Sequence, residues 1–102
     1  MDLTKEQRIM LKEIWSVLKD RLVEFISKTR HKNVDVADTL NNIAVDTLKL
    51  FNNLTGEEAT IAKDFVNFVI NTVISTKSLG KTIDNVDKMY PFLVAIWLQL
   101  SS

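Results

Sequence analysis

Three pairs of neighbouring carboxylates have a spacing that could support general acid–base chemistry, in which one group donates a proton and the other accepts one. The pairs are Asp35/Asp38, Glu57/Glu58 and Asp84/Asp87. Each pair lies at the predicted start of a helix, where the first backbone N–H groups and the positive end of the helix dipole stabilise a carboxylate. Helix capping therefore accounts for all three pairs, and we predict no catalytic residue.

Phosphate-binding and metal-binding patterns are equally incomplete. The run Gly80-Lys81-Thr82 matches the end of a phosphate-binding loop, but the first glycine of that motif would fall on Ser75, inside a predicted helix rather than after a strand. His31 is the only histidine and the chain has no cysteine, so a metal would need Asp35 or Asp38 and further ligands at no known metal-binding spacing. We expect no metal, no cofactor and no enzymatic activity.

The charge balance also narrows the class of partner. The chain has 102 residues with 13 basic and 13 acidic side chains, so its net charge is zero, whereas a protein that neutralises several phosphates normally has a basic surplus. Nucleic acid is therefore a disfavoured partner. The absence of cysteine fits a reducing compartment, and the charged N-terminal residues do not form the apolar core of a secretory signal, so we expect a cytoplasmic protein.

The rest of the sequence predicts an all-α protein. Only two glycines and one proline interrupt apolar residues that recur at helical spacing, which favours one compact domain over residues 1–102, an antiparallel bundle of about four main helices. The first helix should begin at Thr4, because Gln7 three residues later completes a capping box. Its expected core stripe consists of Leu11, Ile14, Trp15, Leu18, Leu22, Phe25 and Ile26.

The spacing of apolar residues and a second capping box predict two further helices. The second, over residues 34–51, is expected to bury Ala37, Leu40, Ile43, Ala44, Leu48 and Phe51 and to expose Asp38, Asn42, Asp46 and Lys49. The third should begin at Thr55 with a second capping box to Glu58. Its broad expected apolar surface comprises Ile61, Ala62, Phe65, Val66, Phe68, Val69, Ile70, Val73 and Ile74, and its narrow polar strip comprises Thr60, Asp64, Asn67, Asn71 and Ser75.

The last helix should start between Thr82 and Pro91, with a kink or a fresh start at Pro91, because proline disfavours helical geometry in the residue before it. Residues 1–51 can be laid over 52–102, which aligns the two capping boxes and suggests two duplicated helical hairpins related by a pseudo-twofold axis. Only six of the 51 aligned positions are identical, so chance similarity between amphipathic helices is the other explanation.

The last helix also raises the main functional question. Residues 89–102 carry no charge and residues 93–98 are all apolar, so this segment must be buried against something. The run is too short to cross a membrane, which takes about 20 apolar residues. It could pack against the rest of the chain, a second copy, a helix of another protein or an apolar ligand.

We predict a non-enzymatic protein-interaction module, of the adaptor, inhibitor or immunity type, which forms a homodimer or binds a heterologous protein through its apolar C-terminal half. Aromatic residues with a polar handle often anchor such contacts. The predicted partner-binding residues are Tyr90, Phe92, Leu93, Ile96, Trp97, Leu100, Asn67 and Asn71, whereas Trp15 is assigned to the core. The alternative is a small carrier that binds a lipid or another apolar ligand in a core cavity.

Overall fold

The computed structural model describes residues 2–29, 36–75 and 86–101. These residues form the α-helices α1 (Lys5–Thr29), α2 (Val36–Lys49), α3 (Gly56–Ser75) and α5 (Val86–Leu100), with no strand in the described ranges. The all-α helical bundle predicted from the sequence is thus confirmed.

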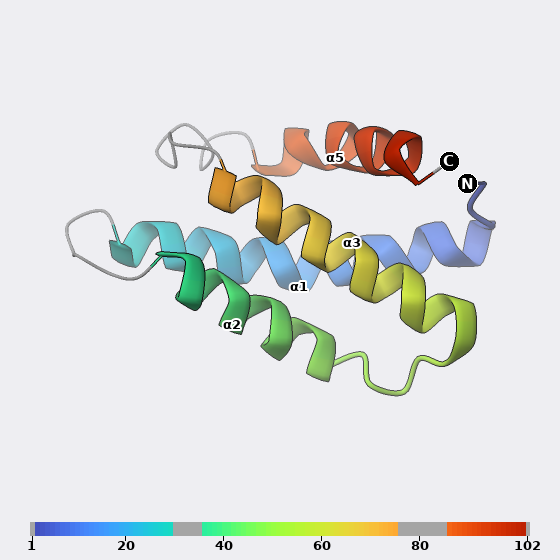
Figure 1. Cartoon of the computed structure of the whole chain (residues 1–102), viewed down its shortest axis with the longest axis horizontal. Helices are drawn as coiled ribbons and strands as arrows, with labels where there is room; N and C mark the ends of the chain where they lie inside the picture. Colours follow the sequence, from blue (N-terminus) through green and yellow to red (C-terminus); the bar gives the residue numbers. More distant parts are fainter. Residues whose placement is uncertain (1, 30–35, 76–85, 102) are drawn as a thin grey trace.

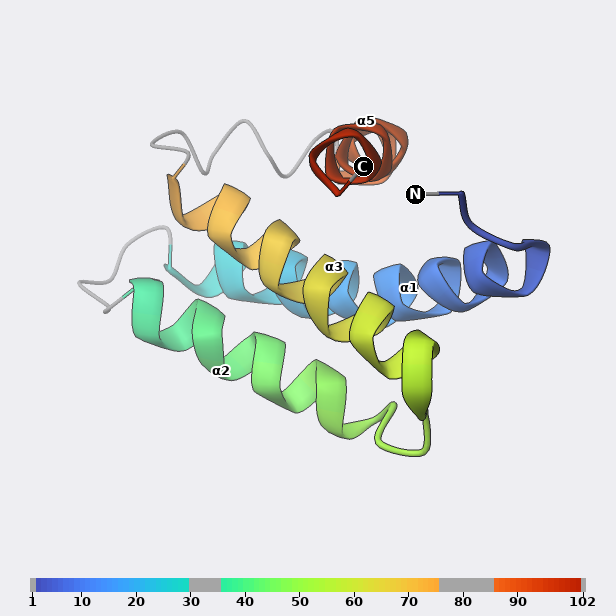
Figure 2. The ribbon, with the colours of Figure 1, turned by 45° about the vertical axis from the view of Figure 1, so that its right-hand side comes forward.

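Successive helices run in alternating directions, and α2 and α5 lie on opposite sides of the pair formed by α1 and α3 (Figures 1 and 2). Both α2 and α5 contact α1 and α3, and α1 also contacts α3 directly. The radius of gyration of 13.5 Å is the value expected for a compact chain of this length. As an edge helix, α5 therefore has one side on the bundle and one side facing outwards.

The start of α1 confirms the predicted capping box. The backbone N–H of Thr4 donates to Oε1 of Gln7 at 3.0 Å, and the backbone N–H of Gln7 donates to Oγ1 of Thr4 at 3.1 Å. Six members of the predicted stripe are buried, namely Leu11, Ile14, Trp15, Leu18, Leu22 and Phe25, whereas the side chain of Ile26 lies outside the description. Leu3, Gln7 and Met10 extend the buried face towards the N-terminus.

In α2 the predicted burial is correct only in part. Leu40 and Ala44 are buried and the four expected polar residues are exposed, but Ala37 is exposed and Ile43, Leu48 and Phe51 are only half-buried. The helix ends at Lys49, and the N–H of Leu50 bonds back to the carbonyl of Thr47 at 3.1 Å in the turn that follows. Thr47 itself is fully buried, and its hydroxyl has no hydrogen-bond partner among the described residues.

The predicted faces of α3 are confirmed, with Phe68 and Ile74 half-buried, the other seven apolar residues buried and the polar strip exposed. The capping box from Thr55 to Glu58 is not found in the described part of the chain. Gly56, the first residue of α3, has a φ of 61°, so a left-handed residue lies between Thr55 and Glu58 and the chain does not enter α3 with the backbone geometry of a capping box. An oxygen of Glu58 instead accepts a hydrogen bond from Nε2 of Gln7 at 3.5 Å, which links α3 to α1.

Helix α5 begins at Val86, within the predicted interval, and continues through Pro91. Of the two outcomes expected at Pro91, a kink or a fresh start, the fresh start is wrong because the helix is continuous. Proline has no N–H to give to the carbonyl four residues earlier, so the helix forgoes one backbone hydrogen bond there.

Two of the four helix boundaries fit the proposed duplication. The start of α1 and the end of α2, Lys5 and Lys49, lie 51 positions before the start of α3 and the end of α5, Gly56 and Leu100. Burial follows the same register between α1 and α3, where the buried Leu11, Ile14 and Leu18 align with the buried Ala62, Phe65 and Val69. It does not follow that register between α2 and α5. The residues 51 positions after the buried Leu40 and Ala44 are the exposed Pro91 and Ala95. Common ancestry of the two halves stays a prediction.

Candidate functional site

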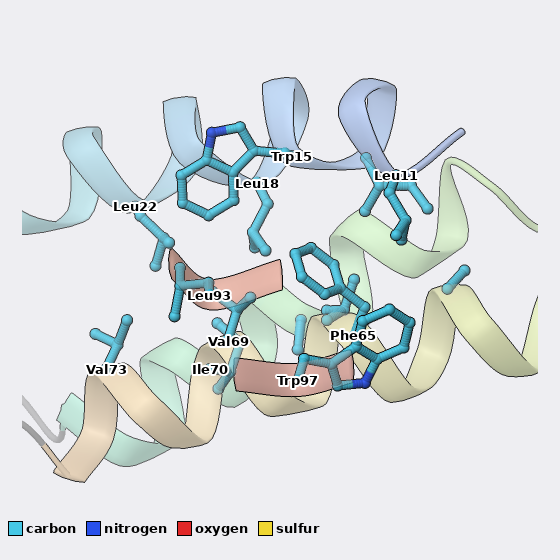
Figure 3. Packing of buried hydrophobic residues seen from close by; sticks show 14 of the residues in the cluster. Leu11, Trp15, Leu18, Leu22, Phe65, Val69, Ile70, Val73, Leu93 and Trp97 are labelled. Atoms are coloured by element: carbon cyan, nitrogen blue, oxygen red, sulfur yellow. The ribbon is translucent and has the colours of Figure 1, made fainter. Parts of the chain in front are cut away.

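The rotation of α5 about its own axis is fixed by two side chains that point into the bundle, Leu93 and Trp97 (Figure 3). They are 4% and 2% exposed. The indole ring of Trp97 meets the ring of Phe65 edge-on, with centroids 5.3 Å apart, and its Nε1–H donates to Oδ2 of Asp64 at 2.9 Å. This arrangement buries the largest side chain of α5 and still gives its only polar atom an acceptor.

The burial of Leu93 and Trp97 corrects their assignment to the partner-binding surface, because both belong to the core of the chain itself. An edge helix that rests between two others buries only one side, and the sequence of α5 is apolar on all sides, so the pattern could not show which residues would turn inwards. Trp15 is buried as predicted.

Tyr90 lies beside the same core and is half-buried. Its ring is 5.4 Å from the ring of Trp15 and 6.2 Å from that of Phe65, measured between centroids. Burial raises the pKa of the Tyr90 hydroxyl above its usual value of 10.0, and the positive charge of Arg8 opposes part of that shift. Tyr90 therefore mainly anchors α5 against the core, and its hydroxyl is close enough to Arg8 on α1 for that charge to affect its pKa.

Leu93 and Trp97 point inwards, and a row of exposed apolar residues lies beside them, about 80° around the helix from the middle of the inward face. Phe92, Ile96 and Leu100 are 71%, 49% and 72% exposed, and their spacing of four residues aligns them along one face of the helix. We call these three residues the α5 stripe. The other strongly exposed large apolar residues in the described part of the chain, Ile9, Val45 and Leu50, are not arranged in such a row.

The two predicted asparagines come close to the C-terminal end of the α5 stripe. Asn67 and Asn71 are exposed on α3, and together with Leu100 and Trp97 they line a pocket of about 320 Å³ between α3 and α5. The remaining lining residues are Asp64, Phe68 and Ser101. The structure thus brings four of the eight predicted residues together at one hollow, although Trp97 contributes to it from the core.

A larger hollow of about 480 Å³, which is not among the sites predicted from the sequence, lies between α1 and α5. Its walls are mostly apolar, and we call it the α1/α5 groove. It is lined by Leu3, Arg8, Leu11, Lys12, Tyr90, Pro91, Val94, Ala95 and Leu98. The one sequence feature that points to this groove is the pair Arg8 and Lys12, two basic residues one helical turn apart beside the predicted core stripe.

Several features that the sequence raised lie outside the described residues, namely His31, Asp35, Asp84 and the run Gly80-Lys81-Thr82. In the described ranges, no three side chains of histidine or acidic residues are close enough to hold a metal ion together. Within the same ranges, no helix has the length and apolar character required to cross a membrane. Asp38, Glu57 and Glu58 each lie in the first turn of a helix, as the capping interpretation predicted.

No protein-family model, curated protein or solved structure matches this chain.

Proposed function

We propose that this chain is a non-enzymatic protein-interaction module that self-associates through the α5 stripe. The observation that carries the proposal is the row of Phe92, Ile96 and Leu100, of which two are more than two-thirds exposed, on a segment without charge from residue 89 to 102. Large contiguous apolar patches are uncommon on isolated proteins and mark interaction sites.

The arrangement of the stripe favours a second copy of the chain as the partner. A symmetric dimer uses the same patch on both subunits, so the patch must be complementary to itself. The stripe is symmetric about Ile96, with one large apolar residue four positions before it and one four positions after, over about 12 Å of helix. An antiparallel pair of α5 helices would therefore place Phe92 against the partner's Leu100 and bring the two copies of Ile96 together at the axis.

The energy available from this surface indicates a weak dimer. The three side chains expose the equivalent of about two whole apolar side chains, and their burial would stabilise the dimer by roughly 3–6 kcal/mol per copy. The two copies together would contribute about 6–12 kcal/mol, against an association cost of about 4–15 kcal/mol. We therefore expect a concentration-dependent equilibrium between monomer and dimer in the micromolar range or weaker.

The test measures solution mass by sedimentation equilibrium across a concentration series. Ile96→Glu would place two carboxylates opposite each other at the dimer axis, so it should leave the chain monomeric at every concentration. Val45→Glu is the matched control, because Val45 is also a half-exposed aliphatic residue, 50% exposed against 49% for Ile96, on α2 at the opposite side of the bundle.

The wild-type chain and the Val45→Glu variant should show the same concentration-dependent rise in mass. A wild-type chain that stays monomeric up to millimolar concentration would overturn self-association, as would equal loss of the dimer in both variants. Circular dichroism of each variant verifies that the helices are retained.

A further inference from the structure

We propose that the α1/α5 groove binds a fatty carboxylate, a ligand that combines an apolar tail with a single anionic head. This site is separate from the α5 stripe. It also differs from the core cavity of a carrier, because the hollow lies between two helices at the surface.

The groove has the size and lining of a small-molecule site. Its volume of about 480 Å³ falls within the range of about 300–1,000 Å³ that is usual for ligand pockets. Leu3 and Leu11 supply apolar surface from the α1 side, and Val94 and Leu98 supply it from α5. The α5 wall runs from Tyr90 to Leu98, about 12 Å of helix, and contains no charged residue.

The charges of the groove are all of one sign. Arg8 and Lys12 are its only charged lining residues, and both are exposed on the α1 side. Their spacing of four residues places them next to each other on one face of α1. Within the described part of the chain, neither forms an ion pair, so both are available to an anion from solution.

These two features together specify the ligand. A carboxylate placed at Arg8 and Lys12 would accept charge-assisted hydrogen bonds, and the planar guanidinium can donate two in parallel. The half-buried hydroxyl of Tyr90 offers one further donor, and Arg8 is near enough for its charge to counteract part of the rise that burial causes in the pKa of Tyr90. The tail of the ligand would then lie along Val94 and Leu98, where it displaces water from apolar surface.

The experiment compares two amphiphiles with matched tails, decanoate and decyltrimethylammonium, each below its critical micelle concentration. Isothermal titration calorimetry gives the Kd, and amide chemical shifts in a ¹⁵N-labelled chain locate the site. Decanoate should bind at least about tenfold more tightly than the cation, the difference expected when hydrogen bonds to a charged head are present or absent. Its shifts should cluster at Leu11, Val94 and Leu98.

Two double variants test the role of the cations. Arg8→Gln with Lys12→Gln should weaken decanoate binding by about tenfold or more and leave the cation's affinity unchanged. Lys5→Gln with Lys63→Gln is the matched control, since neither lysine lines the groove, and it should bind decanoate as the wild type does. Equal affinity for both amphiphiles, no binding of decanoate, or unchanged binding after loss of Arg8 and Lys12 would each overturn the proposal.

The groove and the α5 stripe can be separated with the Ile96→Glu variant, because Ile96 does not line the groove. That variant should bind decanoate with the wild-type Kd even though it is monomeric. Loss of binding in Ile96→Glu would show that ligand binding requires the dimer and would overturn an independent site in one chain.

Discussion

Replacing Trp97 by alanine tests whether α5 is anchored by its inward face. Trp97 is 2% exposed, whereas Phe92, an aromatic residue of the same helix, is 71% exposed. Removal of a buried tryptophan side chain costs about 3–5 kcal/mol, through lost burial and the cavity that remains. The lost hydrogen bond to Asp64 adds little, because Asp64 is exposed and water can replace the indole N–H.

The matched change Phe92→Ala should alter the free energy of unfolding by no more than about 0.5 kcal/mol, as is usual for surface positions. A domain of this size has a total stability of about 5–15 kcal/mol, so Trp97→Ala removes a large share of it. Trp97→Phe keeps an aromatic ring next to Phe65 and removes only the indole N–H and part of the volume. It should therefore fall between the other two variants.

Urea unfolding followed by far-ultraviolet circular dichroism measures all three variants without relying on tryptophan fluorescence. With a slope of about 2 kcal/mol per molar urea, the midpoint for Trp97→Ala should fall by about 2 M. The samples should be dilute, so that self-association does not contribute to stability. Equal costs for Trp97→Ala and Phe92→Ala, or a cost above about 2 kcal/mol for Phe92→Ala alone, would refute the orientation of α5.

Three other predictions concern single residues. Thr47→Val should raise the free energy of unfolding, measured by urea titration, by about 1 kcal/mol, because it removes a buried hydroxyl that has no partner among the described residues. A destabilised variant would show that this hydroxyl forms a hydrogen bond. Gly56→Ala should lower the free energy of unfolding by about 1–2 kcal/mol through backbone strain alone, since φ is 61° and a Cβ would meet no atom within 4 Å. Gly56→Asn should lower it less, because asparagine tolerates the left-handed conformation better. Tyr90, the only tyrosine, should ionise above pH 10.0 in an absorbance titration at 295 nm, and Arg8→Gln should raise its pKa further because the opposing positive charge is lost. The folded chain holds this proton more tightly than the unfolded chain. The contribution of Tyr90 to stability is therefore complete below pH 10.0 and is lost as the pH rises through the pKa of the folded state. Ionisation of Tyr90 below pH 10.0 would contradict this prediction.

The sequence predicts best where polar and apolar residues alternate at helical spacing. The stripe of α1 and the polar strip of α3 were identified correctly, because each lies on a helix with two distinct faces. The cap formed by Thr4 and Gln7 was found because its signature is entirely local. The burial of Thr47 is not predicted because its residue type suggests exposure. The capping role of Glu58 is predicted wrongly because the residue types do not show that Gly56 takes a left-handed conformation.

The candidate site was harder to predict for a physical reason. From Met89 to Ser102 the chain carries no charge, so no contrast marks an inward or outward face. Of the six predicted binding residues on α5, Leu93 and Trp97 proved to be core, whereas Phe92, Ile96 and Leu100 are exposed. Which of these residues are buried and which are exposed is decided only by the packing of α5 against α1 and α3. The α1/α5 groove is not predicted beyond the pairing of Arg8 and Lys12 on one face of α1, since its walls come from helices about eighty residues apart in sequence whose relative position no local pattern encodes.

The two faces of α5 are nevertheless linked, because the residues that bury one face determine what the other presents. Successive residues in a helix are about 100° apart, so fixing Leu93 and Trp97 against the core turns Phe92 to the surface and places Ile96 at the edge of the exposed side. The same anchors hold the α5 wall of the groove beside Arg8 and Lys12 on α1. A conservative change in the core should therefore affect both proposed activities, although the core residues contact neither partner. Trp97→Phe, examined under conditions in which it remains folded, should weaken self-association and decanoate binding together, whereas Ile96→Glu should abolish only self-association. If Trp97→Phe left both affinities unchanged while lowering stability, the rotation of α5 would be set by other contacts, with Tyr90 as the next residue to test.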